Sequence, residues 1–271
     1  VKEVCKKNNV LYTGHAITIL NGYDFGRLFF YHQPLFKQLI DMVSLWDTYK
    51  EIAISPEDIR STFDDIFCRN YSTGNAHIYS PQKKNNPEDL IKKLNLNTDC
   101  KTIVVYTSSP DERKSLAQQA EIEEVQLDIK DLFPDQFIWL KKLCSYIQDH
   151  PEFQLVIRMH PRLGADWRSH IPCVYLEKFK NILRDIPDQC HVVWPQDPIS
   201  SYDLAELADL VLVSWSTMGK ELARIGIPVI ATSQNLHYPN ADFIQIPGSE
   251  EAYFAAIEKT LKDNYTYTTL I

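Results

Sequence analysis

The sequence predicts a doubly wound parallel α/β sheet preceded by a partial N-terminal unit. Beyond residue 100, short apolar runs alternate with amphipathic helical patterns, which is the arrangement of a parallel sheet covered by helices. The runs are short and rich in β-branched residues, as expected of strands that are buried on both faces. Small polar residues follow several of these runs, at the sheet edge where open parallel sheets bind ligands.

Length, charge and residue spacing exclude several classes of protein. The chain of 271 residues is long enough for one or two domains with a large core. A formal net charge of −8 argues against nucleic acid as the main partner. No apolar run approaches the roughly 20 residues that span a bilayer, and no secretory signal is visible. The six cysteines and eight histidines lack ligand spacing, so we expect reduced, mostly packed thiols and no metal site.

The first 70 residues contain two strand signals and two helical patterns. Apolar runs at 10–12 and 17–20 predict strands, and Asn21-Gly22 after the second run is a strong turn signal. The second helix has a clear start, because Ser55 and Asp58 have the spacing of an acidic capping box. Its apolar residues fall on one face, which predicts a helix packed in a core; they are Ile59, Phe63, Ile66 and Phe67.

Residues 71–99 are predicted to connect the two parts of the chain. Residues 71–86 are polar and turn-rich, as linkers are, and 87–94 form a short helix. We therefore expect an N-terminal unit over 1–70, a linker with a short helix over 71–99, and the parallel-sheet domain over 100–271.

The parallel-sheet domain is predicted element by element from its alternating pattern. Expected strands are 102–106, 153–159, 190–194, 210–213 and 228–230, with an edge strand at 243–246. Expected helices lie within 133–151 and at 176–183, 200–208 and 249–262, with a further helix that ends near residue 224, where Gly226 suits the C′ position. The segment between residues 110 and 133 looks like a long loop.

Polar residues at the expected strand ends are the candidate site. Thr107 and Ser108 follow one strand, while Arg158 and Arg162 bracket His160 at the end of the next. Arginine offers a planar fork for phosphate, and a histidine there can donate to a phosphate oxygen or protonate a leaving group. His160 has a structural alternative, since a lone His-Pro pair also occurs for purely structural reasons.

A second group of hydroxyls lies between the strand at 210–213 and the following helix. Ser214, Ser216 and Thr217 stand where free backbone N–H groups at a helix start bind phosphate. The alternative is that Ser216 or Thr217 only caps the helix. Glu221, one turn further, is either a hydrogen-bond acceptor for a ribose or a solvated surface acid.

Several motifs, in their order, resemble the capsule polysaccharide biosynthesis family of bacteria. They are R-M-H-P-R at 158–162, S-S-Y-D-L at 200–204, S-T-x-G-x-E at 216–221 and G-I-P-V-I at 226–230. The resemblance covers roughly residues 70–255. It implies a glycosyltransferase of the GT-B type, built from two Rossmann-like domains with the donor nucleotide bound mainly to the C-terminal one. Some members use a CMP-activated keto-sugar.

The resemblance implies roles for particular residues. His160 would contact the donor phosphate as the catalytic residue, and Ser216 and Thr217 would bind phosphate, with Glu221 on the ribose. Together with Thr107, Ser108, Arg158, Arg162 and Ser214, these form the expected donor site. We expect no metal and no cofactor, with the nucleotide-sugar as substrate. Only residues 1–70 precede the linker, too few for a complete acceptor domain, so the N-terminus is either incomplete or unusually reduced.

The expected function is transfer of a sugar from a nucleotide-sugar donor to a capsular or other surface polysaccharide. The partners would be this donor and a glycan or glycolipid acceptor, in the cytoplasm, with peripheral attachment to the inner membrane left open. Two alternatives remain: a nucleotide-sugar 2-epimerase or glycerophosphotransferase, and a non-catalytic nucleotide-sugar-binding subunit of a polysaccharide assembly complex.

Overall fold

The chain divides into two compact units, which are described separately. Unit 1 comprises Val1–Ile78 and Asp111–Asp128, and unit 2 comprises Tyr79–Pro110 and Ile129–Ile271. The computed structural model describes residues 4, 7–9, 14–18, 24–31, 46–71, 80–122, 131–165, 170–233 and 243–263.

Unit 1 contains a β-hairpin and helices. Strands β1 (Gly14–Thr18) and β2 (Asp24–Tyr31) are antiparallel, with Gly14 opposite Tyr31. The predicted strand at 10–12 and the turn at 21–22 lie outside the described residues. The helices are α3 (Trp46–Tyr49), α4 (Pro56–Tyr71) and α6 (Pro110–Ile122), the last of which was expected to be a loop.

Helix α4 begins as predicted but does not bury its apolar face. The Asp58 N–H donates to Ser55 Oγ at 3.1 Å and the Ser55 N–H donates to Asp58 Oδ2 at 3.0 Å, which confirms the capping box. The prediction of a core-packed helix is wrong, because Ile59, Phe63 and Phe67 are 49%, 60% and 63% exposed. Helical periodicity fixes which residues share a face, but it does not supply a surface to cover them.

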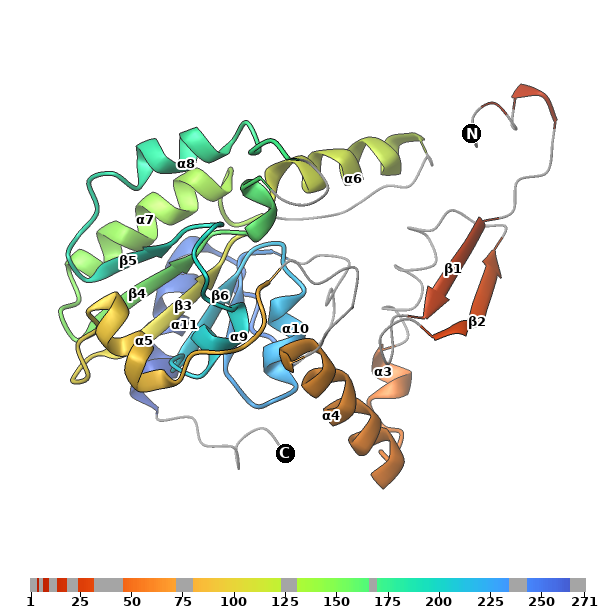
Figure 1. Ribbon diagram of the computed structural model, residues 1–271, viewed down its shortest axis with the longest axis horizontal. Coiled ribbons are helices and arrows are strands. Elements are labelled where there is room, and N and C mark those ends of the chain that lie inside the picture. The colour runs from red at the N-terminus through yellow and green to blue at the C-terminus, as the bar shows by residue number, and fades with distance from the viewer. Residues whose placement is uncertain are drawn as a thin grey trace. The chain divides into compact units, whose positions relative to one another are not determined.

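Unit 2 is built on a five-stranded parallel sheet in the order β5-β4-β3-β6-β7 (Figure 1). The strands are β3 (Lys101–Tyr106), β4 (Phe153–Arg158), β5 (Cys190–Val193), β6 (Leu210–Val213) and β7 (Val229–Ala231). From β3 the chain first adds strands on one side and then returns to add β6 and β7 on the other. The predicted doubly wound α/β class is therefore confirmed, with its topological switch between β3 and β6.

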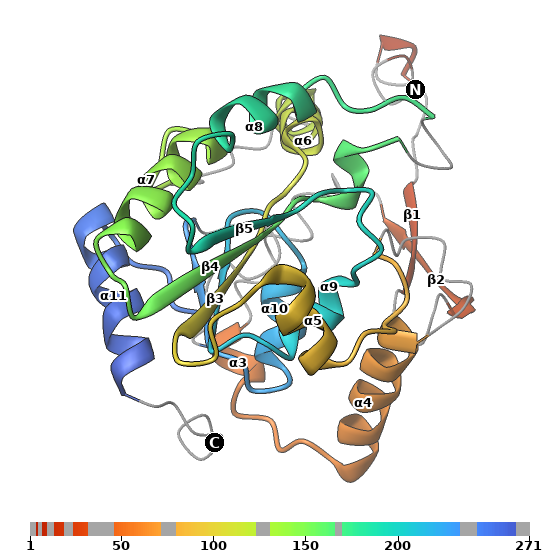
Figure 2. The same ribbon diagram turned by 60° about the vertical axis from the view of Figure 1, so that its left-hand side comes forward.

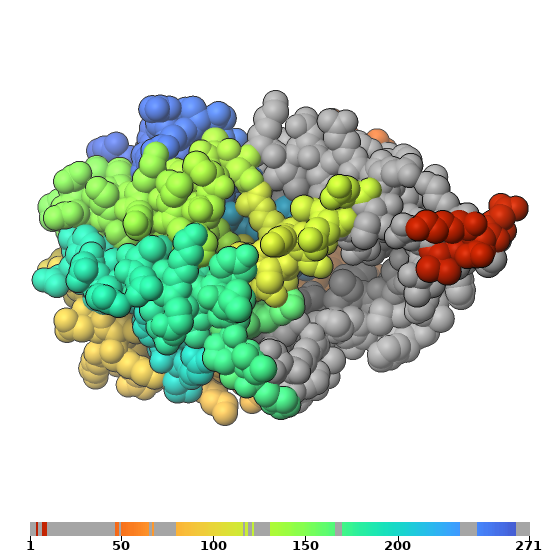
Figure 3. Space-filling view, turned by 90° about the horizontal axis from the view of Figure 1, so that it is seen from above, coloured from red at the N-terminus to blue at the C-terminus, as the bar shows by residue number. Residues whose placement is uncertain are grey.

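Helices cover both faces of this sheet (Figure 2). One core cluster lies between the sheet and α7 (Gln136–Gln148), α8 (Leu176–Ile182) and α11 (Glu250–Lys262). Helices α7 and α8 run side by side on the outside of this layer (Figure 3). The other cluster lies under α5 (Pro87–Leu94), α9 (Ser201–Ala205) and α10 (Met218–Ala223).

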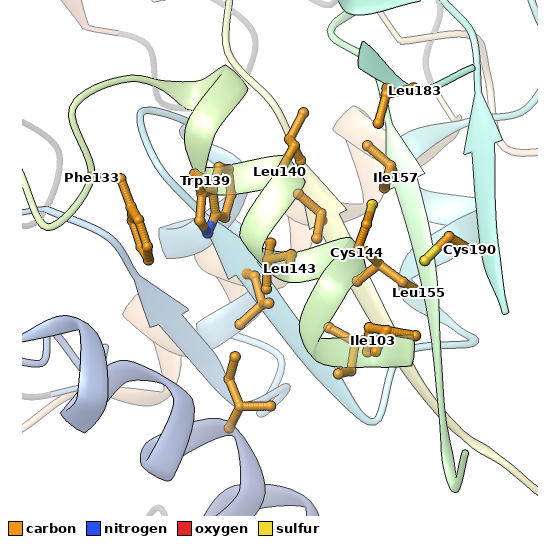
Figure 4. Packing of buried hydrophobic residues seen from close by; sticks show 14 of the residues in the cluster. Ile103, Phe133, Trp139, Leu140, Leu143, Cys144, Leu155, Ile157, Leu183 and Cys190 are labelled. Atoms are coloured by element: carbon orange, nitrogen blue, oxygen red, sulfur yellow. The ribbon is translucent and has the colours of Figure 1, made fainter. Parts of the chain in front are cut away.

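The larger cluster is tightly interlocked. Trp139 of α7 is buried and donates its indole N–H to the hydroxyl of Tyr253 on α11 at 3.0 Å. Figure 4 shows Leu140 and Leu143 of the same helix packed toward Ile103 and Leu155 of the sheet. Burial of several such side chains contributes about 1.5–3 kcal/mol each, enough to hold the strand ends in a fixed register.

Two details of unit 2 bear on the sequence predictions. Gly226 has a φ of 82°, and the Ile227 N–H donates to the Leu222 carbonyl at 3.2 Å, so it occupies the predicted C′ position after α10. The edge strand predicted at 243–246 is wrong: Gln245 forms only an isolated bridge with Ile230. Among the described residues, no helix is both long and apolar enough to cross a bilayer.

Candidate functional site

The carboxyl edge of the unit 2 sheet gathers most of the predicted site residues. Tyr106, the last residue of β3, pairs with Arg158 of β4 on one side and with Val213 of β6 on the other. The residues that follow these three strand ends therefore lie at one level, with neighbouring strands about 4.8 Å apart. This edge includes the switch between β3 and β6, where doubly wound sheets form a ligand crevice.

Thr107 joins the ends of β3 and β4. It is buried, and its hydroxyl donates to the Arg158 carbonyl at 3.3 Å and accepts the His160 N–H at 2.8 Å. The backbone N–H of Thr107 also donates to the Arg158 carbonyl, at 3.1 Å. Because its one hydroxyl hydrogen is already used, Thr107 positions His160 rather than offering a donor to a phosphate.

Arg158 is the most unusual residue at this edge. Its side chain is 1% exposed, and Nη1 donates to the Trp194 carbonyl at 2.7 Å. Nε and Nη2 are buried and have no hydrogen-bond partner. These two N–H groups are adjacent on the guanidinium and point the same way, so together they form a fork that fits two oxygens of one anion.

The electrostatics of Arg158 follow from its burial. Removal from water lowers the pKa of the guanidinium to about 10, while Tyr106 and Asp197 act in the opposite direction. Arg158 therefore stays protonated at neutral pH. A buried cation with two unpaired N–H groups is costly, and such a group needs a physical reason for its presence. An anion seated against the fork would remove most of that cost.

His160 lies directly beyond β4 and is half-buried. It caps the short η1 helix (Pro161–Leu163), with Nδ1 accepting the Arg162 N–H at 3.2 Å. An imidazole that accepts at Nδ1 carries its proton on Nε2, so the ring donor of His160 is its Nε2–H. Arg162 itself is half-buried beside it.

The η1 segment is held closely against the loop that follows β5. A Cβ on Gly164 would lie 2.9 Å from Pro195 Cβ and 2.1 Å from Gln196 Nε2, so a larger residue would force this loop to shift. In the same loop the Trp194 N–H donates to Asp197 Oδ2 at 2.7 Å. The loop that presents its carbonyl to Arg158 is thus fixed at both ends.

Two serine hydroxyls at this edge are buried without a partner. Ser108 exchanges backbone hydrogen bonds with the Gln136 amide at 2.9 and 3.2 Å, yet its Oγ makes none. Ser233, just beyond β7, is also fully buried, with an unpartnered Oγ. A buried hydroxyl without a partner costs stability. These two hydroxyls could therefore form hydrogen bonds with a ligand at this edge of the sheet.

The hydroxyl turn between β6 and α10 differs in part from a simple cap. Ser214 is buried, and Ser216 Oγ accepts the Met218 N–H at 3.3 Å, a long hydrogen bond. Thr217 is the N-cap residue, but its side chain makes no capping bond and is exposed. Ser216 therefore caps weakly, and the Thr217 hydroxyl is not used by the helix.

Glu221 is not the solvated surface acid considered as one alternative. It is 7% exposed, and its Oε2 accepts the Tyr202 hydroxyl at 2.6 Å. Tyr202 comes from α9, so this bond ties α9 to α10. The sequence offered no signal for the pair beyond the two motifs that contain its members, because its formation depends on how the two helices pack.

Two further buried polar residues beside the site were missed or only partly predicted. The Tyr106 hydroxyl donates to the Ser201 carbonyl at 2.7 Å, and burial raises its pKa well above the ordinary value. Asp203 forms a capping box with Ser200 at the start of α9, within the S-S-Y-D-L motif. In addition it accepts the Lys84 N–H at 3.1 Å and the Asn85 amide at 2.6 Å, so it anchors the segment before α5 to α9.

Metal ligation has no support within the described ranges, where no three His, Cys, Asp or Glu side chains come together around a possible ion. Four cysteines whose side chains the structure describes are free thiols: Cys100, Cys144, Cys173 and Cys190.

The sequence matches no protein-family model and no curated protein. The structure is similar to a beta Kdo 2,4 transferase, KpsC of Thermosulfurimonas dismutans, with a TM-score of 0.51 and 10% identity over 93% of this chain and 70% of that one. For the beta Kdo 2,7 transferase of the same organism, the TM-score is 0.44 and the identity is 14% over 92% of this chain and 74% of that one. For UDP-GlcNAc 2-epimerase from Neisseria meningitidis, bound to UDP-GlcNAc, the TM-score is 0.43 and the identity is 15%. The match covers 68% of this chain and 42% of the epimerase, so this chain spans less than half of the epimerase. At such identities the likeness shows the fold: a Rossmann-like α/β domain of the GT-B-like kind.

Proposed function

We propose that this chain is a glycosyltransferase-like protein that transfers a sugar from a nucleotide-sugar donor to a capsular or other surface polysaccharide. The observation that carries the proposal is the unpaired Nε–Nη2 fork of Arg158, buried at the carboxyl edge of the sheet beside His160. A nucleotide-sugar is one class of substrate that would bring a phosphate to the switch point of a Rossmann-like sheet.

The chemistry divides between two residues. Two oxygens of the donor phosphate would accept from the Arg158 fork, and a third would accept from His160 Nε2–H. Both donors face the group on which negative charge increases as the sugar leaves, so they would stabilise the transition state more than the bound donor. Because the fork is buried, a phosphate reaches it only when the side chains that cover it move.

The remaining predicted residues take supporting roles in this proposal. The Thr107 hydroxyl holds His160 in place by accepting the backbone N–H of His160. Thr217 and Ser108 have hydroxyls that no hydrogen bond occupies in the structure, and they are available to the donor. Glu221, whose Oε2 accepts the Tyr202 hydroxyl, would contact the ribose in this proposal. Arg162, Ser214 and Ser216 would complete the donor site, and residues 1–70 would belong to the acceptor side.

The test is a calorimetric titration of the full chain with CMP, UDP, GDP and CDP. We expect one nucleotide to bind and its affinity to fall at least tenfold in Arg158→Met and in His160→Asn. If no nucleotide binds, or if both variants bind as the parent does, the proposal is wrong.

Product analysis with the matching nucleotide-sugar then separates the activities. Transfer to an oligosaccharide acceptor supports a glycosyltransferase. A sugar changed at its C2 position without transfer would indicate an epimerase, and a transferred glycerophosphate a glycerophosphotransferase. Binding with no turnover in the presence of acceptor would indicate a non-catalytic subunit.

A further inference from the structure

A pocket of about 360 Å³ opens at the amino-terminal edge of the unit 2 sheet, at the opposite end of the strands from the candidate site. Its volume falls in the lower part of the range of ligand pockets, roughly 300–1,000 Å³. Strand β4 separates the two edges by its six residues, which span about 20 Å at about 3.3 Å each. The lining residues are Asn95, Asn97, Cys100, Gln148, Pro151, Gln154, Asp188, Gln189 and His191.

The floor of the pocket is rigid because its amides are already bonded. Gln154 is buried; its Oε1 accepts the Asn97 N–H at 2.9 Å, and its Nε2 donates to the Asn97 carbonyl and to Thr102 Oγ1. Gln189 Nε2 donates to the His150 carbonyl at 3.4 Å. These bonds tie the segment before β3 to β4, and the end of α7 to the segment before β5, so the cavity is preformed.

The rim carries polar groups that the fold does not use. The side chains of Asn95, Gln148 and Asp188 are exposed at the mouth, and His191 is half-buried behind them. None of these four side chains has a hydrogen-bond or ion-pair partner within the part of the chain that the structure describes. Burial lowers the pKa of His191, so its ring is neutral at pH 7 and offers one donor and one acceptor.

The charge and shape of the lining select a class of ligand. Among the described residues that line the pocket there is no lysine or arginine, and Asp188 repels phosphates and carboxylates. Two carboxamides, a carboxylate and an imidazole offer the mixture of donors and acceptors that adjacent hydroxyl groups need. Pro151 and Cys100 supply apolar surface for C–H groups. A nucleobase is less suited, because its recognition relies on aromatic stacking and none of the lining residues that the structure describes is Phe, Tyr or Trp.

We propose that this pocket is a secondary glycan-binding site that takes an uncharged sugar unit, separate from the donor site. It would hold part of a polysaccharide chain while chemistry takes place elsewhere on the protein. The inference goes beyond the proposed function, since it rests on the lining of a different edge and stands even if the carboxyl edge binds another anion.

The experiment is a screen of the full chain against an array of neutral and acidic glycans, followed by titration with the best neutral oligosaccharide by calorimetry and saturation-transfer NMR. The test variant is Gln148→Ala/Asp188→Ala, at two exposed positions whose loss leaves the floor intact. The matched control is Asp185→Ala, which removes another exposed carboxylate, three residues from Asp188 and outside the pocket lining.

We expect a neutral glycan to bind the parent and the Asp185 control equally, and the double variant at least tenfold more weakly. Nucleotide affinity should be the same in all three proteins, which separates this site from the donor site. Three results would overturn the proposal: no neutral glycan binds, the double variant binds as tightly as the parent, or cytidine or uridine displaces the glycan.

Discussion

Replacing Arg158 by methionine should separate stability from binding at the candidate site. The variant loses the charge-assisted hydrogen bond to the Trp194 carbonyl, worth about 1.5–3 kcal/mol. It also removes two buried N–H groups that have no partner, each of which costs about 1–3 kcal/mol. Methionine fills a similar volume, so the net change in the free energy of unfolding should lie near zero or favour the variant by a few kcal/mol.

The assay is urea unfolding without nucleotide, alongside calorimetry with the nucleotide that binds best. Affinity should fall at least tenfold, roughly 1.4 kcal/mol, although stability is kept. The control is Arg184→Met, at an exposed arginine of the same unit, which should change the free energy of unfolding by no more than about 0.5 kcal/mol and leave affinity unchanged. A variant that is destabilised by more than about 3 kcal/mol and binds nucleotide normally would show that Arg158 is purely structural.

The same substitution predicts a pH dependence. Burial lowers the pKa of Arg158 to about 10 in the folded protein, below its ordinary value. Below that pH both states carry the proton and the cost of burying the charge is fully present. Above it the unfolded chain binds more protons than the folded one, so the parent gains stability relative to Arg158→Met as pH rises from about 9 to 11. Unfolding both proteins across this window checks the sign, and a falling difference would contradict the burial argument.

Three further predictions concern the surroundings of Arg158. Asparagine in place of His160 keeps a side-chain acceptor for the η1 cap, so the temperature of thermal unfolding should be nearly unchanged. Loss of the Nε2–H donor should weaken nucleotide binding by about 1.5–3 kcal/mol. Unchanged affinity would assign His160 a structural role. Ser216→Ala/Thr217→Ala should lower the free energy of unfolding by about 0.5 kcal/mol or a little more, since only one weak cap is lost. Nucleotide affinity, measured by calorimetry, should fall about tenfold or more. A loss of affinity no larger than the loss of stability would mean that these residues only cap the helix. Gly164→Ala should lower the free energy of unfolding by about 1–3 kcal/mol, because the new Cβ meets Pro195 and Gln196. Gly248→Ala is the control, and it should leave the free energy of unfolding nearly unchanged because the space around Gly248 is open. Equal effects of the two substitutions would show that the η1 contact is not tight.

The elements buried in the sheet were predicted well because one pattern determined them. The strand at 210–213 is buried on both faces, so its four apolar residues mark its ends directly. Helix α6 has no such stripe and was taken for a loop. Its signals are local: Pro110 at the first position, followed by Asp111 and Glu112 in the first turn. Residues 243–246 resemble a strand in pattern, but only Gln245 pairs with β7, and periodicity cannot distinguish one bridge from a ladder.

The candidate site was predictable in position but not in the use of its polar groups. Carboxyl ends of parallel strands meet at one edge, so Thr107, Arg158 and Ser214 could be grouped from their places after apolar runs. Which of their polar groups form hydrogen bonds within the fold depends on strand register and on how the loops approach. Thr107 lies level with the Arg158 carbonyl, and its hydroxyl donates a hydrogen bond to it. The loop after β5, in contrast, accepts a hydrogen bond only from Nη1 of Arg158. Such partners are set by tertiary packing, which no residue spacing encodes.

The order of strands also sets the order in which this unit can be assembled during synthesis. Strand β3 is made first yet ends in the middle of the sheet, where Ile103 pairs with Leu155 on one side and with Leu210 on the other. Until β6 leaves the ribosome, one side of β3 has no strand to pair with, and distant pairings of this kind are slow to form. A nascent chain therefore carries an unpaired edge of Ile103, Val104 and Val105 from the end of β3 at Tyr106 until β6 begins at Leu210. Aggregation or the need for a chaperone should be greatest in this interval.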